Sequence, residues 1–201
     1  MTGAGSMPTS EPATGEITAE IKERSLRDGT WTLRYRLSIP GAFAVSGMPP
    51  ADEVSAHGID FGIRSWEELA GRAFGFPTDP VRIDHTDGEA IPAYAITGAV
   101  RFGEQYDTLR VGRISFDTIA NGVMPVHVFG FIVFDPSCSA SPPQPIDAHG
   151  IVRIGPVHVF SPRTSEPLPL AEAARLAAEF LDLEKYHEPR SAAGFFYDPR
   201  L

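Results

Sequence analysis

The sequence has little of several residue types on which common protein classes depend. Its single cysteine, Cys138, excludes an internal disulfide framework and a cysteine-rich zinc module. No run approaches the roughly 18 apolar residues that a membrane-spanning helix needs, so we expect no membrane partner. Acidic residues outnumber basic ones by 26 to 17, and this excess argues against a nucleic-acid partner.

Recognised catalytic motifs are also missing. The sequence contains no nucleophile elbow, no phosphate-binding glycine loop and no HExxH pair, and it predicts no cofactor. Residues 1–15 have neither a basic start nor an apolar run of the kind found in a secretory signal, so we expect a cytoplasmic location. A pocket enzyme needs no such motif, so whether the chain is an enzyme stays open.

Composition indicates one folded domain rich in turns. The chain has 201 residues, of which 42% are hydrophobic, and it contains 19 glycines and 19 prolines. Residues 1–15 are small and polar without periodicity, which predicts a disordered N-terminal tail. The remaining residues, 16–201, are predicted to form a single domain.

The clearest local pattern is a hairpin between residues 16 and 39. Apolar and polar residues alternate on both sides of the turn at Asp28-Gly29, which is typical of strands with one buried face. A three-residue loop over residues 27–29 would pair Ile21 with Tyr35 and set apolar against apolar, so we expect that loop.

Residues 40–58 read as a long loop, and a short helix follows them. Ser65 and Glu68 have the spacing of a capping box, with Trp66 and Leu69 as anchors. Further along, Gly112 stands where the apolar phase of residues 105–116 changes, which is typical of a bulge.

The segment from residue 41 to residue 100 holds most of the acidity. It carries nine acidic residues and three arginines, a net charge of −6. Within it, a turn concentrates four potential ligands of a hard cation, but their spacing does not match an EF-hand, and a polar turn is the simpler interpretation. These ligands are Asp84, His85, Asp87 and Glu89.

A pentapeptide occurs twice. The letters PVHVF occupy residues 125–129 and again residues 156–160. In a strand, each copy would put His and Phe on one face and the two valines on the other. If the two strands lie side by side, His127 and His158 share a face with Phe129 and Phe160. The histidines are then candidates for catalytic residues, and the phenylalanines for ligand-binding residues. The simpler interpretation is a core or half-exposed histidine that bonds to a backbone carbonyl or to a side chain. Asp117, Asp135 and Asp147 are carboxylates that could orient an imidazole.

A helical stripe follows Pro169. Leu170, Ala173, Ala177 and Leu181 recur at helical spacing, which predicts a long C-terminal helix over residues 169–187. The elements together predict the α+β class: a mainly antiparallel, strongly bent sheet or partial barrel, with one short helix and this long helix.

Two function classes follow from these patterns. The first is a non-catalytic interaction protein, such as an acidic accessory or immunity-like protein for a basic protein partner. Its partner surface would lie in the 41–100 segment, at Glu67, Glu68, Asp84, Asp87 and Glu89. The alternative is a small-molecule-binding protein or enzyme whose sheet-lined pocket contains His127 and His158.

Overall fold

The computed structural model describes most of the chain. The described residues are 13–23, 30–79, 81–84, 90–93, 96–134, 142–160, 168–192 and 194–201; for 81–84, 90–93 and 97 only the backbone is described. The predicted tail over residues 1–15 falls mostly outside these ranges, although Gly15 already begins the first strand.

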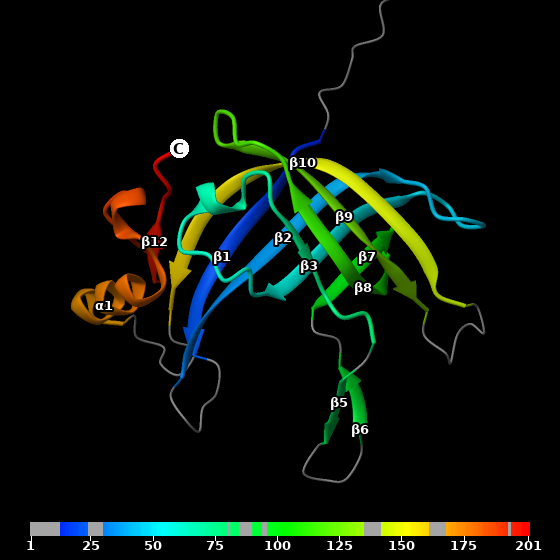
Figure 1. Cartoon of the computed structure of the whole chain (residues 1–201), viewed down its shortest axis with the longest axis horizontal. Helices are drawn as coiled ribbons and strands as arrows, with labels where there is room; N and C mark the ends of the chain where they lie inside the picture. The colour runs from blue at the N-terminus through cyan, green and yellow to red at the C-terminus, as the bar shows by residue number, and fades with distance from the viewer. Residues whose placement is uncertain are drawn as a thin grey trace, which may run out of the picture.

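A closed ring of seven strands dominates the architecture (Figure 1). Every neighbouring pair in the ring is antiparallel except β1 and β10, which run parallel and close it. In the order in which they pair, the strands are β1 (Gly15–Glu23), β2 (Trp31–Phe43), β3 (Ala51–Ile59), β7 (Thr97–Phe102), β8 (Gln105–Phe116), β9 (Val123–Val133) and β10 (Gln144–Val159).

Several shorter strands and a helix lie outside this ring. Strand β12 (Phe195–Tyr197) extends the sheet beside β10 and pairs with β11 (Arg190–Ser191), and β4 (Ala73–Gly75) pairs with β8. Strands β5 (Val81–Asp84) and β6 (Ala90–Ala93) form a separate hairpin that projects from the ring in Figure 1. Helix α1 (Leu170–Phe180) lies near β12 in the same view.

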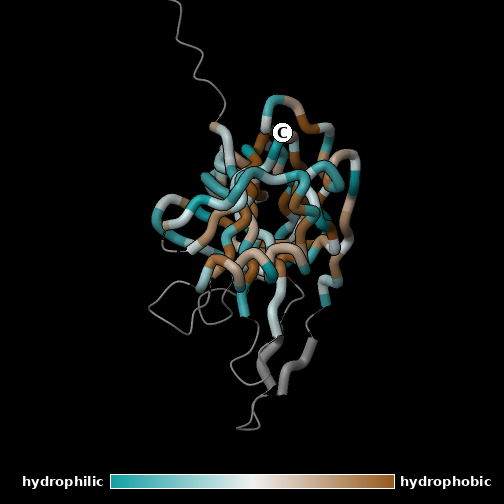
Figure 2. Tube along the Cα trace, turned by 90° about the vertical axis from the view of Figure 1, so that its left-hand side faces the viewer, coloured by the Kyte–Doolittle hydropathy of each residue, from teal (hydrophilic) through white to brown (hydrophobic). Residues whose placement is uncertain are grey.

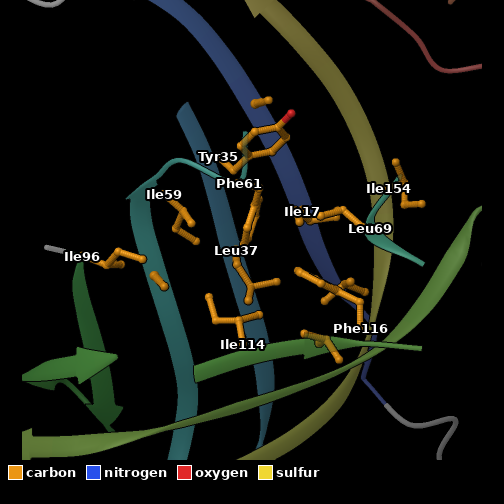
Figure 3. Close-up of a cluster of buried hydrophobic side chains, with 14 of the residues drawn as sticks. Ile17, Tyr35, Leu37, Ile59, Phe61, Leu69, Ile96, Ile114, Phe116 and Ile154 are labelled. Atoms are coloured by element: carbon orange, nitrogen blue, oxygen red, sulfur yellow. The ribbon is translucent and has the colours of Figure 1, made fainter. Parts of the chain in front are cut away.

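The core fills the space that the ring encloses. Apolar side chains on alternate strand positions point inward, and hydrophobic and hydrophilic residues accordingly alternate along the strands in Figure 2. The loop residue Phe61 and the short helix η1 (Trp66–Leu69) add side chains that are almost fully buried. Figure 3 shows Phe61 and Leu69 among strand residues that include Leu37, Ile114 and Phe116.

The predicted α+β class is wrong. The described residues are mostly antiparallel sheet with a single short α-helix, and the predicted long helix over residues 169–187 does not exist. The strongly bent sheet is consistent with the structure, and pairing of β1 with β10 closes it completely into a barrel.

The C-terminal helix ends early because another part of the chain binds its last carbonyl groups. Arg64 donates from Nη2 to the backbone oxygens of Ala178 at 2.9 Å and Leu181 at 3.2 Å. Leu181 itself is extended, and the amide of Asp182 donates to Arg64 O at 3.1 Å instead of continuing the helix. A second short helix, η2 (Leu183–Lys185), follows.

The hairpin forms in a register different from the predicted one. Ile21 faces Leu33 and Ala19 faces Tyr35, two residues away from the pairing that a three-residue loop would give. A shift by two keeps every apolar residue on the inner face, so alternation cannot distinguish the two registers. The turn itself, residues 24–29, lies outside the described residues.

Other local predictions have mixed outcomes. Residues 51–59 form β3 instead of a loop, whereas η1 begins after Ser65 as predicted, with Trp66 and Leu69 buried. The predicted bulge at Gly112 is confirmed by the register shift between β8 and β9. Among the described residues, each helix is too short or too polar to cross a lipid bilayer.

Candidate functional site

The first PVHVF copy lies on β9. The second lies at the C-terminal end of β10, with Phe160 directly after the strand. Val126, Val128, Val157 and Val159 are buried in the core, so the valines face inward as the alternation predicts. His127 and Phe129 belong to the opposite set of positions, and Phe129 is 36% exposed. The outer face of β9 is therefore partly exposed to solvent.

The register between β9 and β10 gives His127 a neighbour that the repeat does not predict. His127 lies directly across from His149, and Asp147 lies across from Phe129. Because side chains alternate along a strand, Asp147 and His149 lie on the same face of β10, which is the face that His127 occupies on β9. An antiparallel pairing thus gathers two imidazoles and one carboxylate on the outer surface.

The three side chains converge on one point. Nε2 of His149 lies 3.1 Å from Oδ1 of Asp147, and Nε2 of His127 contacts the same carboxylate oxygen. The two imidazole rings stack with their centroids 4.0 Å apart and their planes 9° from parallel. One ligand atom from each residue falls within 4.8 Å of the others. We call this group the His-Asp-His cluster.

The cluster is accessible to a ligand. The exposed fractions of its side chains are 34% for His127, 60% for Asp147 and 70% for His149. A hollow of about 320 Å³ borders both histidines, and Ser115, Phe116 and Asp117 are among its lining residues. A second hollow, of about 480 Å³, borders Asp147 and His149 together with residues 40–44.

His158 lies elsewhere. It pairs with Glu20 of β1 and Phe196 of β12, and between position 149 and position 158 a strand rises about 30 Å. Its ring stacks on Phe196, with centroids 4.2 Å apart, and on Phe160, with centroids 4.8 Å apart. The structure therefore does not bring His127 and His158 into one pocket, nor Phe129 beside Phe160.

Packing also explains the chemistry of His158. Burial lowers the pKa of its imidazole, and the nearby carboxylate of Glu20 opposes this shift. Its Nε2 is buried and finds no hydrogen-bond partner among the described residues. The neutral ring of His158 therefore helps to pack the C-terminal segment, because it stacks on Phe160 and Phe196.

The predicted acidic partner surface is only partly described. Glu67 lies 3.6 Å from the ammonium nitrogen of Lys185. The Glu68 carboxylate accepts hydrogen bonds from the backbone amides of Arg64 and Ser65, at 2.9 and 3.0 Å, so it caps η1. The side chain of Asp84, and residues His85, Asp87 and Glu89, lie outside the described residues, so the predicted polar turn and its alternative as a cation site both stay predictions.

Sequence reasoning named His127 and Asp147 separately but missed His149. The available signal was the spacing Asp147-x-His149, which puts both side chains on one face of a strand. Joining that face to His127 required the register between β9 and β10, which the repeat suggested wrongly.

Comparison with known proteins adds no relative. The chain matches no protein-family model, no curated protein and no solved structure. Function is therefore inferred from the geometry of the site.

Proposed function

We propose that this protein binds a divalent transition-metal ion at the His-Asp-His cluster. One observation carries the proposal: the ligand atoms of His127, Asp147 and His149 lie within 4.8 Å of one another on an accessible surface. Two imidazoles and one carboxylate are ligands that zinc, cobalt, nickel and copper accept well, whereas magnesium and calcium prefer oxygen alone.

To hold an ion, the two imidazole rings must turn, because a metal lies in the plane of each ring that binds it and these rings are stacked 9° from parallel. Ligand atoms about 2.1 Å from a tetrahedral metal lie about 3.4 Å from each other. The contact of His149 Nε2 with Asp147 Oδ1, 3.1 Å, already has nearly this length. Both histidines direct Nε2 at the same carboxylate oxygen, so an ion would replace the Nε2 protons between them.

Three protein ligands leave at least one coordination position for water or another small ligand. The hollow of about 320 Å³ beside His127 and His149 gives that position space. This arrangement revises the alternative of a pocket that contains His127 and His158: the geometry supports a site with His127 in it, completed by Asp147 and His149. The interaction hypothesis stays a prediction, because its acidic residues are engaged within the chain or lie outside the described residues.

Titration calorimetry with zinc chloride tests the proposal. We expect one zinc ion per chain, and we expect Asp147→Asn and His149→Ala each to weaken zinc binding by more than about tenfold. His187→Ala is the matched control, because His187 is an exposed histidine outside the cluster. Binding that His149→Ala leaves unchanged, or that His187→Ala weakens equally, would refute the proposal.

A further inference from the structure

A third surface hollow, away from the His-Asp-His cluster, lies on the outer face of β1, β2 and β3. Its volume is about 390 Å³, and most of its polar lining is basic. The basic side chains are Lys22, Arg34, Arg36 and His57. They come from three adjacent strands, and Arg34 and Arg36 alternate with the buried residues Leu33, Tyr35 and Leu37 of β2.

The charges of this hollow are not balanced. Lys22 is held by Glu20 at 3.0 Å, and Arg34 forms an ion pair with Asp60. Arg36, by contrast, is exposed and forms no ion pair within the described part of the chain; its cross-strand neighbours are Thr18 and His57. In a chain with a net charge of −9, this is a local site for a negative ligand.

A bulge shapes the hollow. Between β2 and β3 the register passes from Tyr35–Ile59 to Arg36–His57, so β3 contains one extra residue, Gly58. Gly58 has φ +73°, a conformation that residues with a Cβ rarely adopt, and it belongs to the lining of the hollow. A bulge of this kind bends its strand and redirects neighbouring side chains, and here it sets His57 in register with Arg36.

We infer that this hollow binds the phosphate group of a small molecule. Lys22 and Arg34 already pair with carboxylates, and Glu20 itself lines the hollow. The Arg36 guanidinium and the neighbouring His57 imidazole are therefore the groups left to meet a ligand. A phosphate group offers three or more oxygens and accepts the paired donors of an arginine, so Arg36 is its principal ligand. This inference rests on the β1–β3 surface and is independent of the proposed metal site.

Titration followed by amide and histidine-ring NMR shifts tests the inference, with inorganic phosphate and phenyl phosphate as probes at constant ionic strength. We expect shifts centred on Arg36 and His57, and we expect Arg36→Gln to weaken binding about tenfold. Arg175→Gln removes the same charge from helix α1, where Arg175 pairs with Glu179, and should change the affinity less than twofold.

The two probes distinguish the source of the phosphate. Tighter binding of phenyl phosphate indicates a phosphate ester whose remainder occupies the hollow, and equal binding indicates free phosphate. The inference fails if neither probe shifts Arg36 or His57, or if Arg175→Gln weakens binding as much as Arg36→Gln. Asp147→Asn should leave phosphate binding unchanged, so this result and the zinc result are separate.

Discussion

The imidazole rings of His127 and His149 lie face to face across two antiparallel strands, with centroids 4.0 Å apart. Directly opposed residues of a sheet have Cβ atoms about 4.5–5.5 Å apart, so the backbone register itself holds the two rings together. Asp147 contacts Nε2 of both rings. Three groups that can share one metal ion are thus positioned by main-chain hydrogen bonds.

Zinc binding should weaken as the pH falls from 8 to 5. The imidazole nitrogens must be unprotonated to coordinate zinc, so protons compete with the ion for His127 and His149. Calorimetry in buffers with different heats of ionisation should also show proton release on binding at pH 6. An affinity that is independent of pH over this range would mean that the histidines are not the ligands.

Replacing Gly194 with alanine should destabilise the fold. A Cβ at this position would lie 2.2 Å from Nε2 of His158, so the stacked ring or the C-terminal segment would have to move. We expect Gly194→Ala to lower the free energy of unfolding by about 1–3 kcal/mol, measured by urea denaturation.

Gly75→Ala provides the matched control, because a Cβ there meets no atom within 4 Å. The double variant Gly194→Ala/His158→Ala should lose less stability than the sum of its two single variants, since it removes the clashing ring. Equal costs for Gly194→Ala and Gly75→Ala would contradict the assigned packing.

His158 should make the fold sensitive to acid. Burial lowers its pKa in the folded chain, so the unfolded chain binds the proton more tightly. The stabilisation is complete above the ordinary histidine pKa of about 6.5 and is lost as the pH falls from there through the lower folded value. Urea denaturation at pH 7.5 and at pH 5 should therefore show a larger drop in stability for the native chain than for His158→Leu. Equal drops in the two proteins would refute this role.

Arg64 should stabilise the end of helix α1. Its guanidinium accounts for two hydrogen bonds to helix carbonyls, so Arg64→Ala should lower the free energy of unfolding by about 1–2 kcal/mol. Arg175→Ala removes an exposed ion pair on the same helix and should cost less than about 0.5 kcal/mol. Thermal unfolding followed by circular dichroism compares the two variants, and similar losses would argue against the capping role.

The inward-facing residues of the strands were predictable, but their partners were not. Alternation of apolar and polar residues identifies which face of a strand is buried, as the valines around His127 show. It does not identify the register, because a shift of two residues preserves the faces; Ile21 pairs with Leu33 instead of Tyr35 for this reason. The candidate site depends on register, so His149 escaped prediction.

Long-range contacts explain the other differences. The apolar stripe after Pro169 matches a longer helix, yet Arg64, far away in sequence, binds the carbonyls near position 180 and ends it. The segment 51–59 contains Gly58 and no run of consecutive apolar residues, so its sequence alone does not indicate a strand. It becomes a strand because it pairs with β2 on one side and with β7 on the other. Tertiary pairing overrides local preference at both places.

Anomalous X-ray scattering at the zinc absorption edge, from crystals grown with zinc, tests the central claim most directly. The account predicts an anomalous peak within bonding distance, about 2.1 Å, of Nε2 of His127, Nε2 of His149 and a carboxylate oxygen of Asp147. Crystals with zinc bound only elsewhere, and with Asp147 still contacting both imidazoles directly, would contradict it.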